Sequence, residues 1–191
     1  SSVAMASSSS YVHACAITTS GTLKCWGDNQ YGELGDGTAN DSGIPVTLGS
    51  DTYTKVATGA THTCAIRTGG ALFCWGDNSS NQLGTGGGPV STPTLADAGT
   101  SYIDIATAGS ATCGVTTAGA IKCWGAISYF TPSTVSSPTQ MFAGPFTAIA
   151  LSSTQLCAIG SDGALKCIGS PANGASGDGM FPYWTVPYPI W

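Results

Sequence analysis

Four evenly spaced pairs of cysteines constrain this sequence more than any other feature. Each pair is separated by ten positions, and the surrounding text recurs as HACAITTSGTLKCWG, HTCAIRTGGALFCWG, ATCGVTTAGAIKCWG and QLCAIGSDGALKCIG. The pairs are Cys15–Cys25, Cys64–Cys74, Cys113–Cys123 and Cys157–Cys167. A unit that recurs at this spacing indicates a repeat protein. We therefore treat residues 1–191 as a single domain with repeats at approximately 1–48, 49–97, 98–143 and 144–191.

Each copy is typical of a β-hairpin, because strand-forming residues stand on both sides of a Thr/Ser/Gly turn. If the two cysteines face each other, position 17 lies opposite 23, and Thr19, Ser20 and Gly21 form the loop. The last residue of such a three-residue loop is left-handed, a conformation that costs glycine least. The same position in the other copies is taken by Gly70, Gly119 and Gly163.

Facing cysteines on paired strands come close to disulfide range, so we predict one disulfide in each hairpin. The sharper alternative is zinc, because His13 and His62 each stand two residues before a cysteine and share its strand face. However, Ala111 and Gln155 take that position in the other copies, and the cysteine spacing is not that of a zinc knuckle. Cysteines used wholly in disulfides place a protein in an oxidising compartment, outside the cell or on its surface.

Composition makes several classes of function improbable. Only 8% of the residues are charged and the net charge is -5, so the chain offers no counter-charge for phosphate backbones, and nucleic acid is not an expected partner. No stretch approaches the roughly 18 apolar residues that a membrane helix needs. Hydrophobic residues still make up 42% of the chain, which is enough to bury a core.

The segments around the hairpins also recur. Short β-rich runs begin at Tyr53, Tyr102 and Phe146 before three of the hairpins. Gly-rich loops and a proline-containing segment follow them, and no window shows sustained helical periodicity. Each unit is therefore expected to hold three or four short strands.

The combination Gly-x-x-His-Thr-Cys-Ala-Ile, a glycine turn, Cys-Trp-Gly-Asp-Asn and Gly-x-Leu-Gly resembles the regulator-of-chromosome-condensation repeat family. It is most specific at residues 59–84 and 13–37, and the cysteine pairs look like those of secreted or cell-surface members. The resemblance implies that each unit builds one four-stranded propeller blade. The expected fold is all-β: a β-propeller or propeller segment of four blades, with one disulfide inside each blade.

The family usually closes with seven blades, which leaves three expectations for a chain with four. It is a segment of a longer chain, a complete four-bladed ring, or one subunit whose stack of sheets is completed by another chain. Copies three and four also depart from the Asp-Asn loop pattern, so a ligand site shared by all four repeats is not expected.

Three tryptophans, Trp26, Trp75 and Trp124, each follow the second cysteine of a pair and so point to the sheet face opposite the sulfur. They are either an aromatic platform for sugars or packing between neighbouring blades. We favour packing, because Ile168 stands at this position in the fourth copy. His13 and His62 share one repeat position, which favours internal hydrogen bonds.

Catalytic groups are sparse. With both histidines in repeat register, a Ser-His-acid triad has no convincing base. Asp28 and Asp77 share a repeat position, but nothing else supports a catalytic carboxylate pair. We predict a non-enzyme with no catalytic residue, metal or cofactor. Calcium is an alternative for the oxygen-rich loop that holds Asp28, Asn29, Asp36, Asn40 and Asp41, although turn chemistry explains these residues equally well.

Two sequons, Asn40-Asp-Ser42 and Asn78-Ser-Ser80, lie in turn-rich segments that are expected to be exposed, so Asn40 and Asn78 are candidate glycosylation sites. A Ser/Thr/Pro stretch at 131–139 is a weaker candidate for O-glycosylation. The chain ends in an aromatic and proline-rich segment, 181–191, that either docks onto a neighbouring subunit or packs across its own last blade.

These features favour a non-catalytic extracellular structural or protein-interaction module, within a longer chain, a homo-oligomer or a larger assembly. Its candidate contacts to a protein partner or to glycans are Asp28, Tyr31, Tyr183, Trp184, Tyr188 and Trp191. One alternative is a carbohydrate-binding module that uses Tyr31 and Asp28. Another is a secreted inhibitor of an enzyme, since some propellers of this family plug enzyme clefts with one loop-bearing face.

Overall fold

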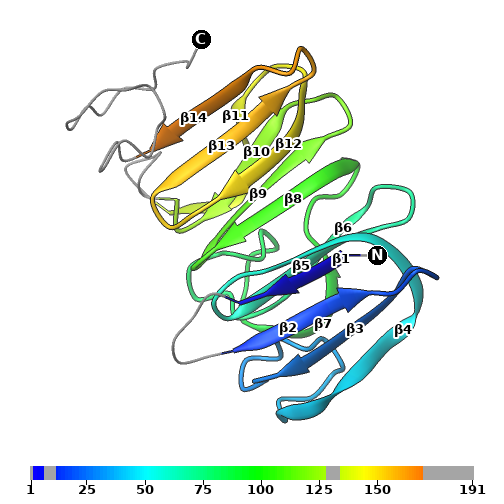
Figure 1. Cartoon of the computed structure of the whole chain (residues 1–191). Helices are drawn as coiled ribbons and strands as arrows, with labels where there is room; N and C mark the ends of the chain where they lie inside the picture. The colour runs from blue at the N-terminus through cyan, green and yellow to red at the C-terminus, as the bar shows by residue number, and fades with distance from the viewer. Residues whose placement is uncertain (1, 7–11, 128–133, 170–191) are drawn as a thin grey trace.

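The computed structural model describes residues 2–6, 12–127 and 134–169, and all of the regular structure in these ranges is β-strand (Figure 1). The strands are β1 (Ser2–Met5), β2 (His13–Ile17), β3 (Thr22–Gly27), β4 (Ser42–Thr58), β5 (His62–Arg67), β6 (Leu72–Gly76), β7 (Val90–Leu95), β8 (Tyr102–Ala108), β9 (Ala111–Thr116), β10 (Ile121–Gly125), β11 (Val135–Phe142), β12 (Phe146–Leu151), β13 (Gln155–Gly160) and β14 (Leu165–Gly169).

The strands form four antiparallel blades in chain order. Blade 1 holds β1, β2, β3 and the first part of β4, and blade 2 holds the second part of β4 with β5, β6 and β7. Blade 3 holds β8 to β11, and the described part of blade 4 holds β12 to β14. The all-β propeller segment that the family resemblance implies is confirmed.

One strand, β4, serves two blades. Ser42 and Thr47 pair with β3, whereas Tyr53 and Thr58 pair with β5, so blades 1 and 2 join in a single seven-stranded sheet. This strand runs without interruption through the repeat boundary expected near residue 48. The boundaries expected near residues 97 and 143 fall between strands.

The hairpins have the predicted register. Cys15 lies opposite Cys25 and Ile17 opposite Leu23, and the Gly21 N–H donates to the Thr18 carbonyl at 3.0 Å. Gly21 has a φ of 86°, the left-handed conformation that the three-residue loop requires. A positive φ also occurs at Gly70, Gly119 and Gly163.

Each blade contains one disulfide across its hairpin, as predicted. The Cα atoms of the four cystines, Cys15–Cys25, Cys64–Cys74, Cys113–Cys123 and Cys157–Cys167, are 4.0–4.1 Å apart. Because side chains alternate across a strand, the sulfurs all lie on one face of each blade and the tryptophans on the other. We call these the cystine face and the tryptophan face.

The core lies between the blades. Ile17 and Leu23 on the cystine face of blade 1 pack with Val56, Ala65 and Trp75 on the tryptophan face of blade 2. Two further clusters of buried residues fill the junctions between blades 2 and 3 and between blades 3 and 4. The described blades follow one another in an open arc, with β1 to β3 at one end and β12 to β14 at the other (Figure 1).

Candidate interaction surfaces

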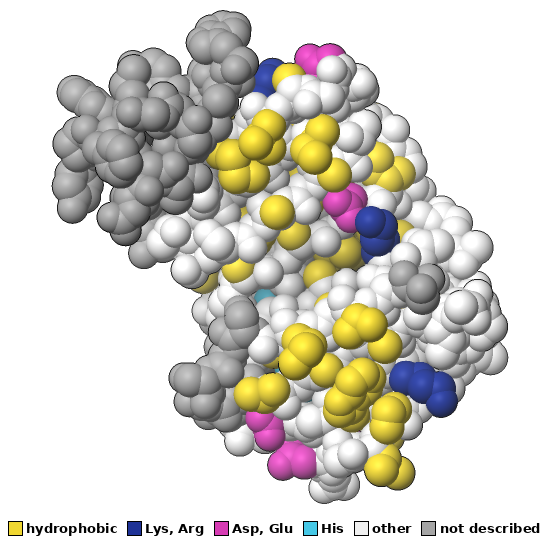
Figure 2. Space-filling model, in the orientation of Figure 1, with side chains coloured by type: hydrophobic (Ala, Val, Ile, Leu, Met, Phe, Trp, Pro, Cys, Tyr) yellow, Lys and Arg dark blue, Asp and Glu magenta, His cyan; other side chains and the backbone are white. Residues whose placement is uncertain are grey.

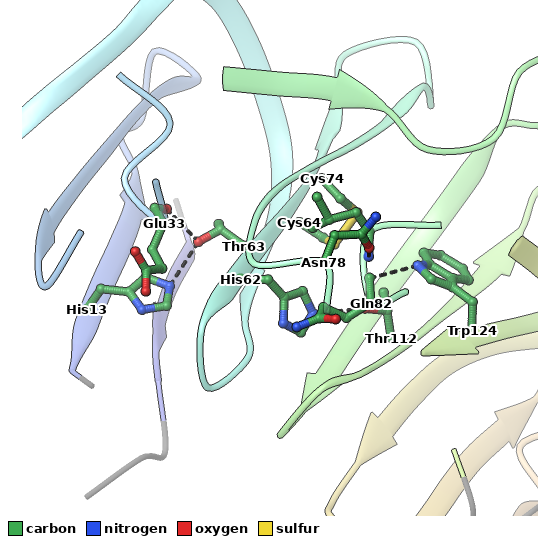
Figure 3. Close-up of a disulfide and its surroundings, with 11 residues drawn as sticks. His13, Glu33, His62, Thr63, Cys64, Cys74, Asn78, Gln82, Thr112 and Trp124 are labelled. Atoms are coloured by element: carbon green, nitrogen blue, oxygen red, sulfur yellow. Dashed lines mark hydrogen bonds between the residues drawn. A yellow bond between two sulfur atoms is a disulfide. The ribbon is translucent and has the colours of Figure 1, made fainter. Parts of the chain in front are cut away.

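A polar contact recurs in the first two junctions (Figure 3). His13 Nε2 lies 2.9 Å from the hydroxyl of Thr63, which in turn donates to the Glu33 carbonyl at 2.9 Å. The Trp75 indole donates to the same carbonyl at 2.7 Å. Because the threonine has only one proton to donate, it accepts from His13, which assigns the ring proton to Nε2. Blade 1 is thus joined to blade 2 by hydrogen bonds buried among apolar side chains.

The second junction repeats this geometry one repeat later. His62 Nε2 lies 2.9 Å from the Thr112 hydroxyl, and Thr112 donates to the Gln82 carbonyl at 2.8 Å. The Trp124 indole donates to that carbonyl at 2.9 Å. The prediction that the tryptophans pack between blades is confirmed for Trp75 and Trp124, which are fully buried. Trp26 is half-buried, since it lies on the tryptophan face of the first blade.

Both histidines are neutral in this setting. Burial lowers the pKa of His13 to about 4 despite the opposing influence of Asp28, and it lowers the pKa of His62 to about 3. Their predicted internal hydrogen bonds are confirmed. The zinc alternative fails on two counts, because the neighbouring sulfurs are joined in disulfides and each ring binds a threonine of the next blade.

The third junction is apolar instead. Ala111 stands where the first two blades have histidine, and Leu156 and Ile168 replace the threonine and the tryptophan. Ile127 joins Ala111 and Leu156 in the buried cluster. The replacements are coordinated, since losing the histidine alone would leave the hydroxyl of a threonine without its donor.

Buried asparagines organise the loops that follow the first two hairpins. Asn29 donates through Nδ2 to the Asn40 carbonyl at 3.0 Å and accepts the Leu34 N–H at 2.8 Å. Asn78 donates to the Gly87 carbonyl at 2.9 Å and accepts the Leu83 N–H at 3.0 Å. These loops are therefore fixed from within.

The expectation that the Asn78 sequon is exposed is wrong. Asn78 is only 3% exposed, and the amide nitrogen to which a glycan would be attached already donates to Gly86 and Gly87 inside the loop. Asn40 is exposed on the same kind of loop in blade 1, so its glycosylation stays a prediction.

The acidic side chains of these loops serve the turns. Asp36 accepts from the Thr38 N–H at 2.9 Å, and Asp41 accepts from the Asn29 N–H at 2.8 Å. Burial acts to raise the pKa of Asp77, but hydrogen bonds from Ser79 and other neighbours outweigh it and hold that pKa below its usual range. In the described ranges no three of His, Cys, Asp or Glu gather as metal ligands would.

Tyr31 lies at an open groove of about 300 Å³ between the first of these loops and the start of β7. Thr38, Pro89 and Ser91 line the groove with it. Asp28, the other loop residue expected to contact a partner, is not part of the lining; its carboxylate accepts from the Val12 N–H. Of the two residues proposed for a sugar site, only Tyr31 therefore lines this groove.

The other candidate contacts, Tyr183, Trp184, Tyr188 and Trp191, lie outside the described residues, as do residues 131–133 of the 131–139 stretch. Within the described ranges, no helix has the length and apolarity needed to cross a membrane.

Sequence reasoning missed a charged bridge across three blades. Asp104 on β8 forms an ion pair of 3.1 Å with Lys55 on β4, and its other carboxylate oxygen accepts the Ile149 N–H of β12 at 3.0 Å. The signal was present in the repeats, because Lys55 and Asp104 occupy the same repeat position with opposite charges. The bridge ties together the strands that lie side by side along the arc.

Two segments of the chain, 8–33 and 53–82, match the family model of the regulator of chromosome condensation (RCC1) repeat. They contain the first two hairpins with their buried histidine and asparagine residues. The chain carries RCC1 repeats in these two segments. Its cysteine pairs extend the same hairpin to four copies, of which the last two have lost the histidine and most of the loop pattern.

Several solved structures resemble the arc over most of its length. Human WBSCR16 matches with a TM-score of 0.80 at 20% identity, over 94% of this chain and 50% of that one. Prp20p of Saccharomyces cerevisiae matches with 0.75 at 20% identity, over 97% and 52%. The ectodomain of the Arabidopsis thaliana receptor kinase ACR4 matches with 0.59 at 19% identity, over 90% and 54%.

These identities establish the fold alone. The chain spans about half the length of each of these three proteins. No curated protein sequence matches it significantly.

Proposed function

We propose that this chain is a non-catalytic, extracellular module that binds a protein partner. The proposal rests mainly on one observation: the histidines and carboxylates that catalysis would need are engaged in structural hydrogen bonds. His13 and His62 are buried, neutral and bonded to the next blade, and the loop carboxylates accept hydrogen bonds within their own turns. What the repeats leave on the surface is a set of rigid loops, which suits recognition better than chemistry.

The extracellular part of the proposal is supported by the cysteines. All eight are joined in disulfides, and each disulfide closes a single hairpin. Such a set is maintained in an oxidising compartment and is reduced in the cytosol or the nucleus.

The protein-binding part is supported by the fold. The yeast relative Prp20 has been crystallised with Kap60 bound and is described by its binding to Gsp1p and histones. For the present chain we assign the contact to the groove at Tyr31, because an aromatic side chain beside Pro89 on a fixed loop offers contact area at little cost in entropy.

A carbohydrate partner is the second candidate, since Tyr31 in an open groove is also suited to stacking on a sugar ring. Asp28 does not line the groove, which counts against a carbohydrate partner, because the lining then lacks the acidic group expected to bind sugar hydroxyls.

The proposal is tested by placing a photo-crosslinking amino acid at position 31 and applying the protein to cells of the source organism. We expect one protein to be crosslinked from position 31 and not from position 44, where Ile44 is 73% exposed on an outer strand and serves as the matched control. Binding to a glycan array without a protein crosslink would support the carbohydrate alternative instead. Turnover of a hydrolase substrate that disappears in Asp28→Asn or Asp77→Asn would overturn the non-catalytic assignment.

The compartment is tested separately. Intact mass of the natural protein should rise on reduction by two hydrogens per disulfide, for all four disulfides. Free thiols in the protein as isolated under alkylating conditions would contradict an extracellular location.

A further inference from the structure

We propose that Thr92 and Ser137 are attachment sites for O-linked glycans, one on the outermost strand of blade 2 and one on that of blade 3. Ser137 belongs to the Ser/Thr/Pro stretch 131–139, whereas Thr92 lies outside it. The modification goes beyond the binding of a partner. It rests on the extracellular part of the proposed function, because the glycans that we assign are those of an exported protein.

A bulge recurs in the outermost strand of the first three blades. In each case three residues stand opposite the single residue that follows the second cysteine of the hairpin: residues 43–45 in β4, 91–93 in β7 and 136–138 in β11. The last residue of each bulge is a proline. Such a bulge interrupts the ladder, turns side chains outward and blunts the edge of the blade, so it has a structural use in all three blades.

The middle residue of the bulge is what distinguishes the blades. It is Ile44 in blade 1, Thr92 in blade 2 and Ser137 in blade 3, and all three are exposed. The bulge of blade 1 forms with Ile44, whose side chain is 73% exposed and packs on nothing that would hold the bulge in shape. The bulge therefore does not require the hydroxyls that blades 2 and 3 place at this position.

These two hydroxyls are also free of the rest of the described chain. Across residues 2–6, 12–127 and 134–169, neither Thr92 Oγ1 nor Ser137 Oγ has a hydrogen-bond partner. The backbone that carries them is nevertheless fixed. Thr94 Oγ1 donates to the Thr92 carbonyl at 3.1 Å. Thr139 Oγ1 donates to the Ser137 carbonyl at 2.9 Å. Each bulge thus presents one exposed hydroxyl on a backbone held in place from within its own strand.

A hydroxyl in this setting is suited to accept a sugar. Its oxygen attacks the anomeric carbon of a sugar carried on a nucleotide or lipid phosphate, the bond from that carbon to the phosphate oxygen breaks, and the hydroxyl proton passes to a base of the transferase. Serine and threonine beside proline are typical of O-glycosylated segments. The proline keeps the residue before it extended and has no N–H to satisfy, so the acceptor is already extended when the enzyme binds it.

The composition of the chain gives such glycans a use. Only 8% of the residues are charged, and Figure 2 shows few charged side chains on the face that it draws. Charged side chains commonly keep protein surfaces apart, so this chain needs other hydrated groups. A glycan is bulky and solubilising, and on an outermost strand it also shields a sheet edge from pairing with another molecule.

Peptide mass spectrometry of the natural protein, by a fragmentation method that leaves sugars attached, tests the proposal. We expect Thr92 and Ser137 to carry the added mass of one or more sugars. Thr47 and Thr139 are matched controls in the same protein, because both are exposed on outermost strands but neither precedes a proline. They should carry no sugar.

Two variants produced in the source organism test the position directly. Thr92→Val removes the hydroxyl and keeps the shape of the side chain, so the glycan at position 92 should be lost while that at Ser137 stays. Ile44→Thr gives blade 1 the Thr-Pro pair of blade 2, so a glycan should be gained at position 44. Thr92→Ser restores a hydroxyl and should regain the glycan, which separates loss of the acceptor from loss of the fold.

The outcomes separate this proposal from the proposed function. Unmodified Thr92 and Ser137 in a protein with all four disulfides intact would overturn the glycosylation and leave the extracellular location unaffected. Phosphate in place of sugar would overturn the glycosylation, and free thiols in the same protein would overturn the extracellular location as well. Sugar on Thr47 or Thr139, or none gained in Ile44→Thr, would overturn the assignment of the sites to the bulges.

Discussion

At the scale of single residues, Glu33 and Gln82 show what a buried carboxylate costs this fold. The two occupy the same repeat position and are fully buried. Gln82 uses both ends of its amide, accepting the Ser80 N–H at 2.8 Å and donating to Asp77 at 2.8 Å. Glu33 accepts the Tyr31 N–H at 2.9 Å, but its Oε1 has no hydrogen-bond partner in the described structure. Burial, with a smaller contribution from Asp28, raises the pKa of Glu33.

We predict that Glu33→Gln stabilises the protein at pH 7.5 by about 1 kcal/mol. Because the folded state holds the Glu33 proton more tightly than the unfolded state, the natural protein loses stability as the pH rises through the raised pKa. The variant has no such loss, so its advantage should disappear near pH 4. Urea unfolding at the two pH values measures the difference. The reverse change, Gln82→Glu, should destabilise at pH 7.5, and a stabilising effect there would contradict the explanation.

At the scale of elements, the four disulfides close hairpins of one length but differ in their surroundings. Cys64 and Cys74 are fully buried in the junction between blades 2 and 3, whereas Cys157 on blade 4 is half-buried. Loop closure accounts for at most about 3 kcal/mol in each case. The difference between them therefore comes from packing, since removing a buried sulfur leaves a cavity.

We predict that replacing Cys64 and Cys74 by alanine lowers the free energy of unfolding by more than replacing Cys157 and Cys167. Urea unfolding at pH 7.5 gives the two values. An equal or larger loss at Cys157–Cys167 would show that loop closure, and not the junction, determines what a disulfide contributes.

The hairpins were predictable from the sequence because the cysteine spacing fixes their register and the glycine fixes the turn. The partner of His13 was not, since Thr63 lies 50 residues away in the next blade. A signal for it exists: histidine in one copy occurs with threonine in the next, and the two are lost together at Ala111 and Leu156.

Asn78 shows why the candidate site was harder to predict than the fold. Its neighbours are turn-forming residues, which indicate an exposed loop, but the loop closes around the asparagine side chain. Asn29 occupies the same repeat position as Asn78, and this was the better guide. A residue shared by repeats more often serves their common packing. Our sequence analysis found no pattern that predicts the continuity of β4 across two blades.

At the scale of the whole molecule, the buried histidines make the cohesion of the blades depend on pH. Their pKa values of about 4 and about 3 lie below the usual 6.5 because burial disfavours the charged ring. As the pH falls below 6.5 the unfolded chain takes up protons that the folded chain does not, so folding becomes less favourable. Each histidine contributes up to about 1.4 kcal/mol per pH unit in this range.

We predict that giving the second junction the residues of the third, by His62→Ala with Thr112→Leu, reduces this acid sensitivity by about half, because one of the two buried histidines is removed. Free energies of unfolding at pH 7.5, 6.0 and 5.0 measure it. Both proteins should carry Glu33→Gln, since the raised pKa of Glu33 makes folding more favourable as the pH falls and so opposes the histidines. The single change His62→Ala, which leaves the Thr112 hydroxyl without its donor, should be less stable than the double variant at pH 7.5. If the free energy of unfolding depends on pH in the double variant as it does in its parent, the explanation is wrong. His62 would then be protonated in the folded state without loss of stability, and the blades would not be held together through its neutral form.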